Sequence, residues 1–238
     1  MDKDPNPRLN RLVGALPEAE WLRWRSQLEP IELLRGHTIH EPGRPLSHVY
    51  FPTTAIVSLQ CVTDAGSSTE IAVVGSEGLV GLSIYMGGGS TSNRAVVQSD
   101  GQAHRMRAEV LMDEFNRPPV RDLLLRYTQA LIAQMAQTAA CNRHHTLDQQ
   151  LCRLLLMRLD RLPGREIEMT HELIANMLGV RREGVTASAH SCQQAGLISY
   201  SRGHIAVLDR LGLERRACEC YEVVRREYDR LLSSLSLG

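Results

Sequence analysis

The side chains best suited to specific recognition are Arg181, Arg182 and Glu183, which open a segment of helical pattern directly after a turn. A guanidinium group donates several hydrogen bonds from a fixed fork, and a carboxylate accepts them. In a helix-turn-helix, the start of the second helix is the part that enters the major groove of DNA. The chemistry predicted here is therefore contact with nucleotide edges. We predict no catalytic residue, because no nucleophile has a base at a recognisable spacing.

The surrounding residues, 170–198, have the pattern of two short helices joined by a turn and followed by a strand. Thr170 suits an N-cap, and Gly179 falls where the chain must turn with a positive φ. The first helix has an apolar face at helical spacing, formed by Leu173, Ile174, Met177 and Leu178. An ordinary helical hairpin within a core is the alternative for this pattern. Residues 198–209 then alternate as two short strands, which is typical of a wing whose tip can contact phosphates.

The rest of the chain predicts an α+β fold. A short amphipathic helix is predicted at 17–28. From 31 to about 110, runs rich in Val, Ile, Thr and Tyr alternate with turn signals such as Asp100-Gly101, which predicts an all-β sandwich or barrel. We divide the chain into a β-rich domain at 1–115, a long helix at 116–145 and a winged helix-turn-helix domain at 146–238.

The long helix has a narrow seam of residues spaced three and four apart, which is typical of helices that pair. The seam is formed by Leu124, Tyr127, Leu131, Met135 and Thr138. We predict that it packs against a second copy of the chain, giving a homodimer. A plain core helix is the alternative. Further helices are predicted at 146–160 and, after a cap at Asp209, at about 211–234.

Composition excludes several classes of protein. The chain has 238 residues, 43% of them hydrophobic, and it has 27 basic and 27 acidic residues. Any attraction to DNA must therefore come from local placement of arginines rather than from net charge. No segment approaches the length of a membrane span, and the first residues lack the apolar core of a secretory signal. We expect a cytoplasmic protein with no membrane partner.

Metal binding is not predicted. The six cysteines form no Cys-x-x-Cys pair, and they are Cys61, Cys141, Cys152, Cys192, Cys218 and Cys220. Two of them, Cys218 and Cys220, lie two apart in the predicted last helix, so they should point to nearly opposite sides.

One alternative class is a metal enzyme of the cupin type, with His37, His40, Glu41 and His48 as ligands. His37 and His40 are three apart, however, and would point to opposite faces of a strand.

The order of these parts resembles the Crp–Fnr family of bacterial transcription regulators, over nearly the whole chain. The most specific segments are LIANMLGVRREGV with its following hairpin, the segment HEPGRPLSHVYFPTTAIVSLQ, and EGLVGL at Glu77–Leu82. The resemblance implies a homodimer with an antiparallel β-roll of the jelly-roll type, like that of cyclic-nucleotide-binding domains. It also implies control by a small-molecule effector, a palindromic promoter site on double-stranded DNA, and RNA polymerase as a further partner.

The resemblance also assigns residues to the DNA contact. It implies that Arg182 and Glu183 read bases, since arginine can donate to guanine and glutamate can accept from cytosine. It implies contacts with phosphates from Thr170, Arg181, Thr186, Ser201, Arg202 and His204.

The implied effector pocket departs from the pattern of members that bind cyclic AMP. Those members have Gly-Glu-Leu and then Arg-Ser or Arg-Thr before Ala, whereas this chain has Gly81-Leu82-Ser83 and Asn93-Arg94-Ala95. A shift of Arg94 by one place along a strand would turn it to the other face. We therefore expect no cyclic AMP bound in the usual manner, no assigned cofactor, and an unidentified effector in this pocket. A regulator that needs no effector is the alternative.

Overall fold

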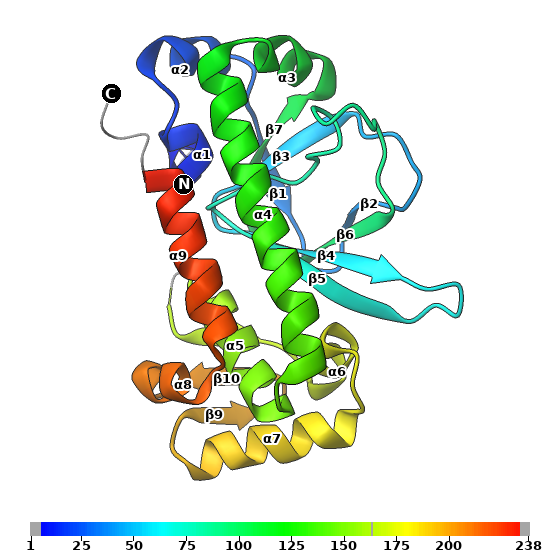
Figure 1. The fold of residues 1–238 in the computed structure, drawn as a ribbon, viewed down its shortest axis with the longest axis vertical. Coiled ribbons are helices and arrows are strands. Elements are labelled where there is room, and N and C mark those ends of the chain that lie inside the picture. The colour runs from blue at the N-terminus through cyan, green and yellow to red at the C-terminus, as the bar shows by residue number, and fades with distance from the viewer. Residues whose placement is uncertain (1–5, 163, 234–238) are drawn as a thin grey trace. The chain divides into compact units, whose positions relative to one another are not determined.

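The computed structural model describes residues 6–162 and 164–233, which form two compact units (Figure 1). The first unit takes in the described parts of 1–59, 73–132 and 227–238, and the second takes in 60–72 and the described parts of 133–226. The fold is α+β, as predicted: antiparallel sheets come first, a long helix follows, and helices around a small sheet come last. None of the described helices is long and apolar enough to cross a membrane.

The β-rich part consists of two antiparallel sheets. Its strands are β1 (Glu29–Leu33), β2 (Thr38–His40), β3 (His48–Pro52), β4 (Ile56–Val62), β5 (Ser68–Val74), β6 (Asn93–Ser99) and β7 (Gly101–Arg107). One sheet has the order β1-β7-β3 and the other has the order β2-β6-β4-β5. The turn between β6 and β7 requires Gly101, because an added Cβ would lie 2.4 Å from the Ala55 backbone nitrogen. The predicted turn is therefore set by a close approach of two backbone segments.

Short helices flank these sheets in the sequence. They are a 3₁₀ helix at Pro7–Leu9, α1 (Arg11–Gly14), α2 (Glu18–Trp24) and α3 (Ala108–Phe115), of which only α2 was predicted. Trp24 is 1% exposed and lies against Phe51, with ring centroids 5.6 Å apart. Its indole nitrogen donates to the Glu114 carboxylate at 3.3 Å, and Arg23 pairs with the same carboxylate at 2.6 Å. These contacts fix α2 and α3 in the first unit.

Helix α4 spans Pro118–His144, close to the predicted limits. The residues of its predicted dimer seam are covered by their own chain, however, which corrects the choice of face. Leu124, Tyr127, Leu131 and Thr138 are at most 9% exposed, and Met135 is half-buried. The Tyr127 hydroxyl donates to the Leu79 carbonyl at 2.8 Å, and an added Cβ at Gly78 would lie 2.5 Å from the Tyr127 ring. The segment Glu77–Leu82 thus anchors α4 within the first unit.

A different face of α4 is exposed. Leu125 is 48% exposed and Ile132 is 56% exposed, and Ala136 and Ala139 continue the same stripe at steps of seven, four and three residues. Such spacing keeps the four side chains on one side of a helix. These four side chains form an exposed apolar stripe along α4.

The second unit holds the predicted winged helix. Its elements after α4 are α5 (Leu147–Leu159), β8 (Glu166–Glu168), α6 (His171–Leu178), α7 (Arg182–Gln194), β9 (Ile198–Ser201), β10 (His204–Val207), α8 (Arg210–Arg216) and the start of α9 (Glu219–Ser233). Strands β8, β10 and β9 form an antiparallel sheet in that order. Its core is built from apolar side chains that are at most 2% exposed: Leu151, Leu155, Ile174, Val185, Ile205 and Leu213.

The predicted last helix is in fact two helices. Asp209 caps the first, α8, by accepting from the Gly212 backbone N–H at 2.9 Å, as predicted. The chain leaves the helical conformation at Ala217, whose φ is −68° and ψ is 160°, and α9 begins at Glu219. Cys218 therefore precedes α9, and the inference that Cys218 and Cys220 diverge on one helix is wrong.

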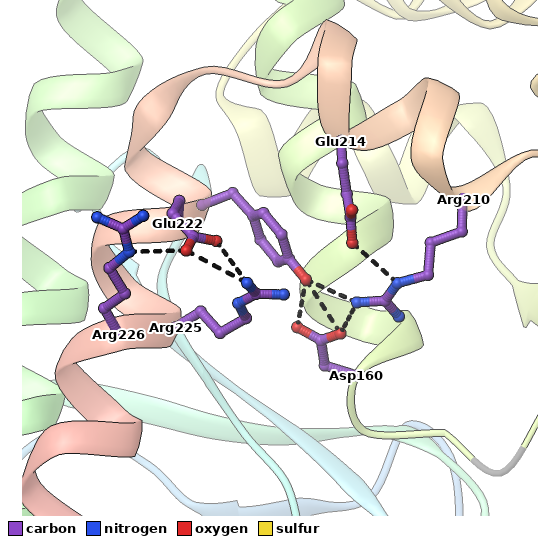
Figure 2. Close-up of polar contacts among 7 residues, drawn as sticks. Asp160, Arg210, Glu214, Glu222, Arg225 and Arg226 are labelled. Atoms are coloured by element: carbon purple, nitrogen blue, oxygen red, sulfur yellow. Dashed lines mark hydrogen bonds and ion pairs between the residues drawn. The ribbon is translucent and has the colours of Figure 1, made fainter.

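A polar network holds α8 and α9 to the end of α5 (Figure 2). The Arg210 guanidinium contacts the Asp160 carboxylate at 2.5 Å and Glu214 at 3.0 Å. The Tyr221 hydroxyl donates to Asp160 at 3.0 Å, and Arg210 donates to that hydroxyl at 2.7 Å. Burial, reinforced by the Asp160 charge, raises the pKa of Tyr221 to about 12. The phenol is therefore neutral and stays a donor at neutral pH.

Candidate nucleic-acid interface

The turn between α6 and α7 is built as the sequence predicts. Thr170 caps α6, since its hydroxyl oxygen accepts from the Leu173 backbone N–H at 3.1 Å. Gly179 ends the helix with φ 67° and ψ 35°, a left-handed conformation that glycine adopts without strain. The Val180 backbone N–H then donates to the Ala175 carbonyl at 3.0 Å. This arrangement sets the direction in which α7 starts.

The first turn of α7 carries charged side chains on the surface. Arg181 is its N-cap residue, with an extended backbone, and Arg182 and Glu183 follow as the first helical residues. All three are exposed, and none of their side chains forms a hydrogen bond or ion pair with another residue in the described part of the chain. The opposite face of α7 is buried through Val185, Ser188, Ala189 and Cys192. The helix therefore presents free donors and acceptors at one end of a firmly packed element.

A network of hydrogen bonds on the inner side of α7 fixes this helix to α5. The Asp148 carboxylate on α5 accepts hydrogen bonds from Ser188 on α7 and from Arg216 at 2.6 Å. Arg216 also contacts the Ser191 hydroxyl. Burial alone would raise the pKa of Asp148, but these hydrogen bonds and the Arg216 charge outweigh it and lower that pKa. Nothing local in the sequence identifies Arg216 as a partner, because it lies 68 residues from Asp148.

His171 is a second residue that sequence reasoning missed. Its Nδ1 lies 3.0 Å from the Thr186 hydroxyl, which itself donates to the Arg182 carbonyl at 3.1 Å. The His171 ring stacks on Tyr200 with centroids 4.2 Å apart. Burial, and then the Arg182 charge, lowers the pKa of His171. The Thr186 hydroxyl has these two partners inside the motif, and its contact with phosphate stays a prediction.

The wing is a two-residue hairpin. Ser201 pairs with His204, and the turn residues Arg202 and Gly203 have φ of 49° and 87°. Positive φ at both positions is the pattern of a type I′ turn, in which asparagine is favoured over arginine at the first position. Ser201, Arg202 and His204 are exposed at its tip, and His204 lies 3.9 Å from Glu168 on β8. Strand β8 has three residues, too few for its alternation to be recognised in the sequence.

The predicted effector residues line a very small cavity in the first unit. Gly81, Leu82, Ser83 and Asn93 share a space of about 20 Å³ with neighbouring side chains, enough for one water molecule. Arg94 does not line it: its guanidinium pairs with Glu41 at 2.8 Å.

A larger cavity of about 260 Å³ lies nearby, lined by residues of β2, β3 and the loop between them. Its polar lining residues include His40, Glu41, Arg44, His48 and Tyr50. Burial lowers the pKa of both His40 and His48, which favours neutral rings that can donate and accept. Among the described residues, the histidines considered as cupin ligands do not gather with a third metal-binding side chain.

Comparisons with known proteins agree on one family. Residues 149–216 match the model of a Crp-like helix-turn-helix domain. A CRP-like cAMP-activated global transcriptional regulator from Mycobacterium tuberculosis is 24% identical over 200 residues, covering 80% of this chain and 89% of that protein. The solved structure of a putative transcriptional regulator of the Crp/Fnr family from Eubacterium rectale superposes with a TM-score of 0.68 at 21% identity, covering 86% and 96% of the two chains. FixK2 from Bradyrhizobium japonicum also has a TM-score of 0.68, at 17% identity, covering 80% and 98%.

Proposed function

We propose that the chain is a DNA-binding transcription regulator of the Crp–Fnr type, and that it acts as a homodimer on a palindromic promoter site. Each protomer inserts the first turn of α7 into the major groove, and such a regulator works in the cytoplasm with RNA polymerase as a partner. The proposal rests on one observation above all: Arg181, Arg182 and Glu183 are exposed without partners in the described chain, while the back of α7 is fixed to α5.

Two of these side chains suit base recognition. Arg182 can donate two hydrogen bonds to guanine O6 and N7, and Glu183 can accept one from cytosine N4. We propose that other exposed residues contact phosphates, which set the register without reading sequence. These residues are Arg181, Thr170 and the wing residues Ser201, Arg202 and His204.

The homodimer is assigned to the exposed stripe of α4 defined by Leu125, Ile132, Ala136 and Ala139. Small residues at two of the four positions let two helices approach closely, and the large ones supply apolar area. A twofold axis along such a pair gives two equivalent recognition helices. Their half-sites would then lie about 34–36 Å apart, one helical turn of DNA.

The effector of this regulator is assigned to the cavity of about 260 Å³ between β2 and β3. A space of about 20 Å³ at Gly81–Ser83 is too small for a cyclic nucleotide, whereas the larger cavity offers a cation at Arg44 and neutral histidines. A small polar metabolite with an anionic group fits this lining. We expect cyclic AMP not to bind in titration calorimetry.

Selection of genomic fragments by the purified protein tests the whole proposal. Wild-type protein should enrich one site with twofold symmetry, and a metabolite extract should change its affinity. Arg182→Ala should lose discrimination at one base pair of each half-site by about 1–3 kcal/mol, while Gln194→Ala, at the far end of α7, should select the same site as wild type. An unchanged site for Arg182→Ala would remove the proposed role. An extract without effect would favour the effector-independent alternative.

A further inference from the structure

Four side chains that are distant in the sequence converge in the second unit. They are Cys141 in the last turn of α4, His145 just after it, Cys218 before α9 and Cys220 in the first turn of α9. The three cysteines are at most 4% exposed and His145 is half-buried. The Sγ atoms and one ring nitrogen all lie within 4.8 Å of one another. Three thiols and an imidazole are a known structural ligand set for zinc.

From this geometry we propose that the chain binds one zinc ion through Cys141, His145, Cys218 and Cys220. With Zn–S bonds of about 2.3 Å and Zn–N bonds of about 2.0 Å, the ligand atoms of a tetrahedral site lie roughly 3.5–3.8 Å apart. The Sγ atoms of Cys141 and Cys218 are 3.5 Å apart, and Cys220 Sγ is 3.6 Å from His145 Nδ1. The site needs only small adjustments to close around an ion.

The surroundings of His145 support the assignment. Its Nδ1 faces the thiols, and its Nε2 lies 3.2 Å from the Glu219 carboxylate. A metal-bound histidine typically donates its other N–H to a carboxylate or carbonyl, which fixes the tautomer. Gln150 on α5, which is 6% exposed, donates to the Cys141 carbonyl at 3.3 Å and to the His145 carbonyl at 2.9 Å. Both ligands from the end of α4 are thus held by a buried amide.

Charge balance also favours a metal. Arg153 is 7% exposed, and in the described chain its guanidinium has one hydrogen-bond partner, the Thr138 hydroxyl at 2.9 Å, and no carboxylate. A buried cation without a counter-charge is strongly unfavourable. Arg153 lies close enough to Cys141 and Cys220 to act on both electrostatically. A zinc ion with three thiolates and a neutral histidine carries a net charge of −1, which supplies the missing counter-charge.

Other uses of these cysteines fit less well. A disulfide between Cys141 and Cys218 would leave Cys220, His145 and Glu219 without a role. An iron–sulfur cluster would hold its ligand sulfurs much farther apart than a single ion does, because several irons lie between them. The bound ion would join the end of α4 to the start of α9 in the second unit, and binding would add to the stability of the folded state.

Elemental analysis of full-length protein, prepared under reducing conditions without a metal-affinity tag, tests the proposal. We expect about one zinc per chain in the wild type, and loss of zinc in Cys220→Ser and His145→Ala. Cys61→Ser, which removes the exposed cysteine, should keep the zinc. Iron in place of zinc, or reduced protein without metal, would overturn the assignment.

A second measurement tests the proposal even if the ligand variants fail to fold, because it uses the wild-type protein. Wild-type protein stripped by a chelator should bind Co²⁺ and show the absorption of a tetrahedral cobalt–thiolate centre. Glu219→Gln should fold and bind zinc about 10-fold more weakly in competition with a chromophoric chelator, or weaker still. An octahedral cobalt spectrum without thiolate bands would contradict the proposed ligands. An unchanged zinc affinity in Glu219→Gln would contradict the proposed role of Glu219 in holding His145. These results do not depend on DNA binding.

Discussion

The second unit contains two sets of arginines that look alike in the sequence and differ in their partners. Arg181, Arg182 and Arg202 are exposed and form no ion pair within the described chain. Arg158, Arg210 and Arg216 each pair with a carboxylate, from Glu70, Asp160 and Asp148 respectively. The presence of an ion-pair partner, rather than residue type, therefore separates the arginines that we propose contact DNA from those that hold the winged helix together.

The largest expected effect is a loss of stability on substitution of Arg158, the most buried of the three arginines that pair with carboxylates. The Arg158 side chain is 3% exposed and that of Glu70 is 11% exposed. Arg158→Ala should lower the free energy of unfolding by about 3–5 kcal/mol, because it leaves the Glu70 charge buried and alone. Denaturant unfolding measures this, with Arg181→Ala as the matched exposed control, expected within about 0.5 kcal/mol of wild type. Equal losses of unfolding free energy in the two variants would contradict the distinction between paired and exposed arginines.

An intermediate effect is expected at the wing. Arg202→Asn keeps a residue that tolerates positive φ while it removes the charge, so the fold should be unchanged. DNA affinity should fall several-fold on all sequences alike, and the slope of log affinity against log salt should decrease by about 1. Fluorescence anisotropy over a salt series gives both quantities. An unaltered salt slope would show that Arg202 does not contact a phosphate.

The smallest effect concerns acid stability. Because the folded-state pKa of Asp148 is lowered, its carboxylate stabilises the fold at pH above the unfolded pKa of about 3.9. That contribution is lost as pH falls through the folded pKa. Asp148→Asn should therefore cost about 0.2–1 kcal/mol at neutral pH and nothing extra in acid, since Asp148 is partly exposed. Unfolding curves of both proteins at several pH values should converge at low pH; parallel curves would contradict this.

Local signals in the sequence predicted much of the fold. The cap at Thr170, the turn at Gly179, the cap at Asp209 and the hairpin at Arg202-Gly203 depend on neighbouring residues, and all are confirmed. The prediction of which face of α4 forms the dimer contact was wrong, because periodicity shows that a stripe is apolar but does not show what covers it. In the structure Tyr127 contacts Leu79, which lies 48 residues away in the sequence.

Features that depend on distant residues could not be predicted in this way. Cys141 and Cys218 are 77 residues apart and meet only through the packing of the second unit. Their spacing suggested no shared site because the break at Ala217 was not recognised. The same holds for Arg216, whose partner Asp148 lies on another helix.

Interference by guanine methylation tests most directly whether the first turn of α7 reads bases. A methyl group at N7 blocks one of the two acceptors that Arg182 would use. At one guanine in each half-site, methylation should abolish binding of the wild type but not reduce binding of Arg182→Ala any further. If methylation of every guanine in the site affects the two proteins equally, Arg182 does not contact a base, and the account of this interface is contradicted.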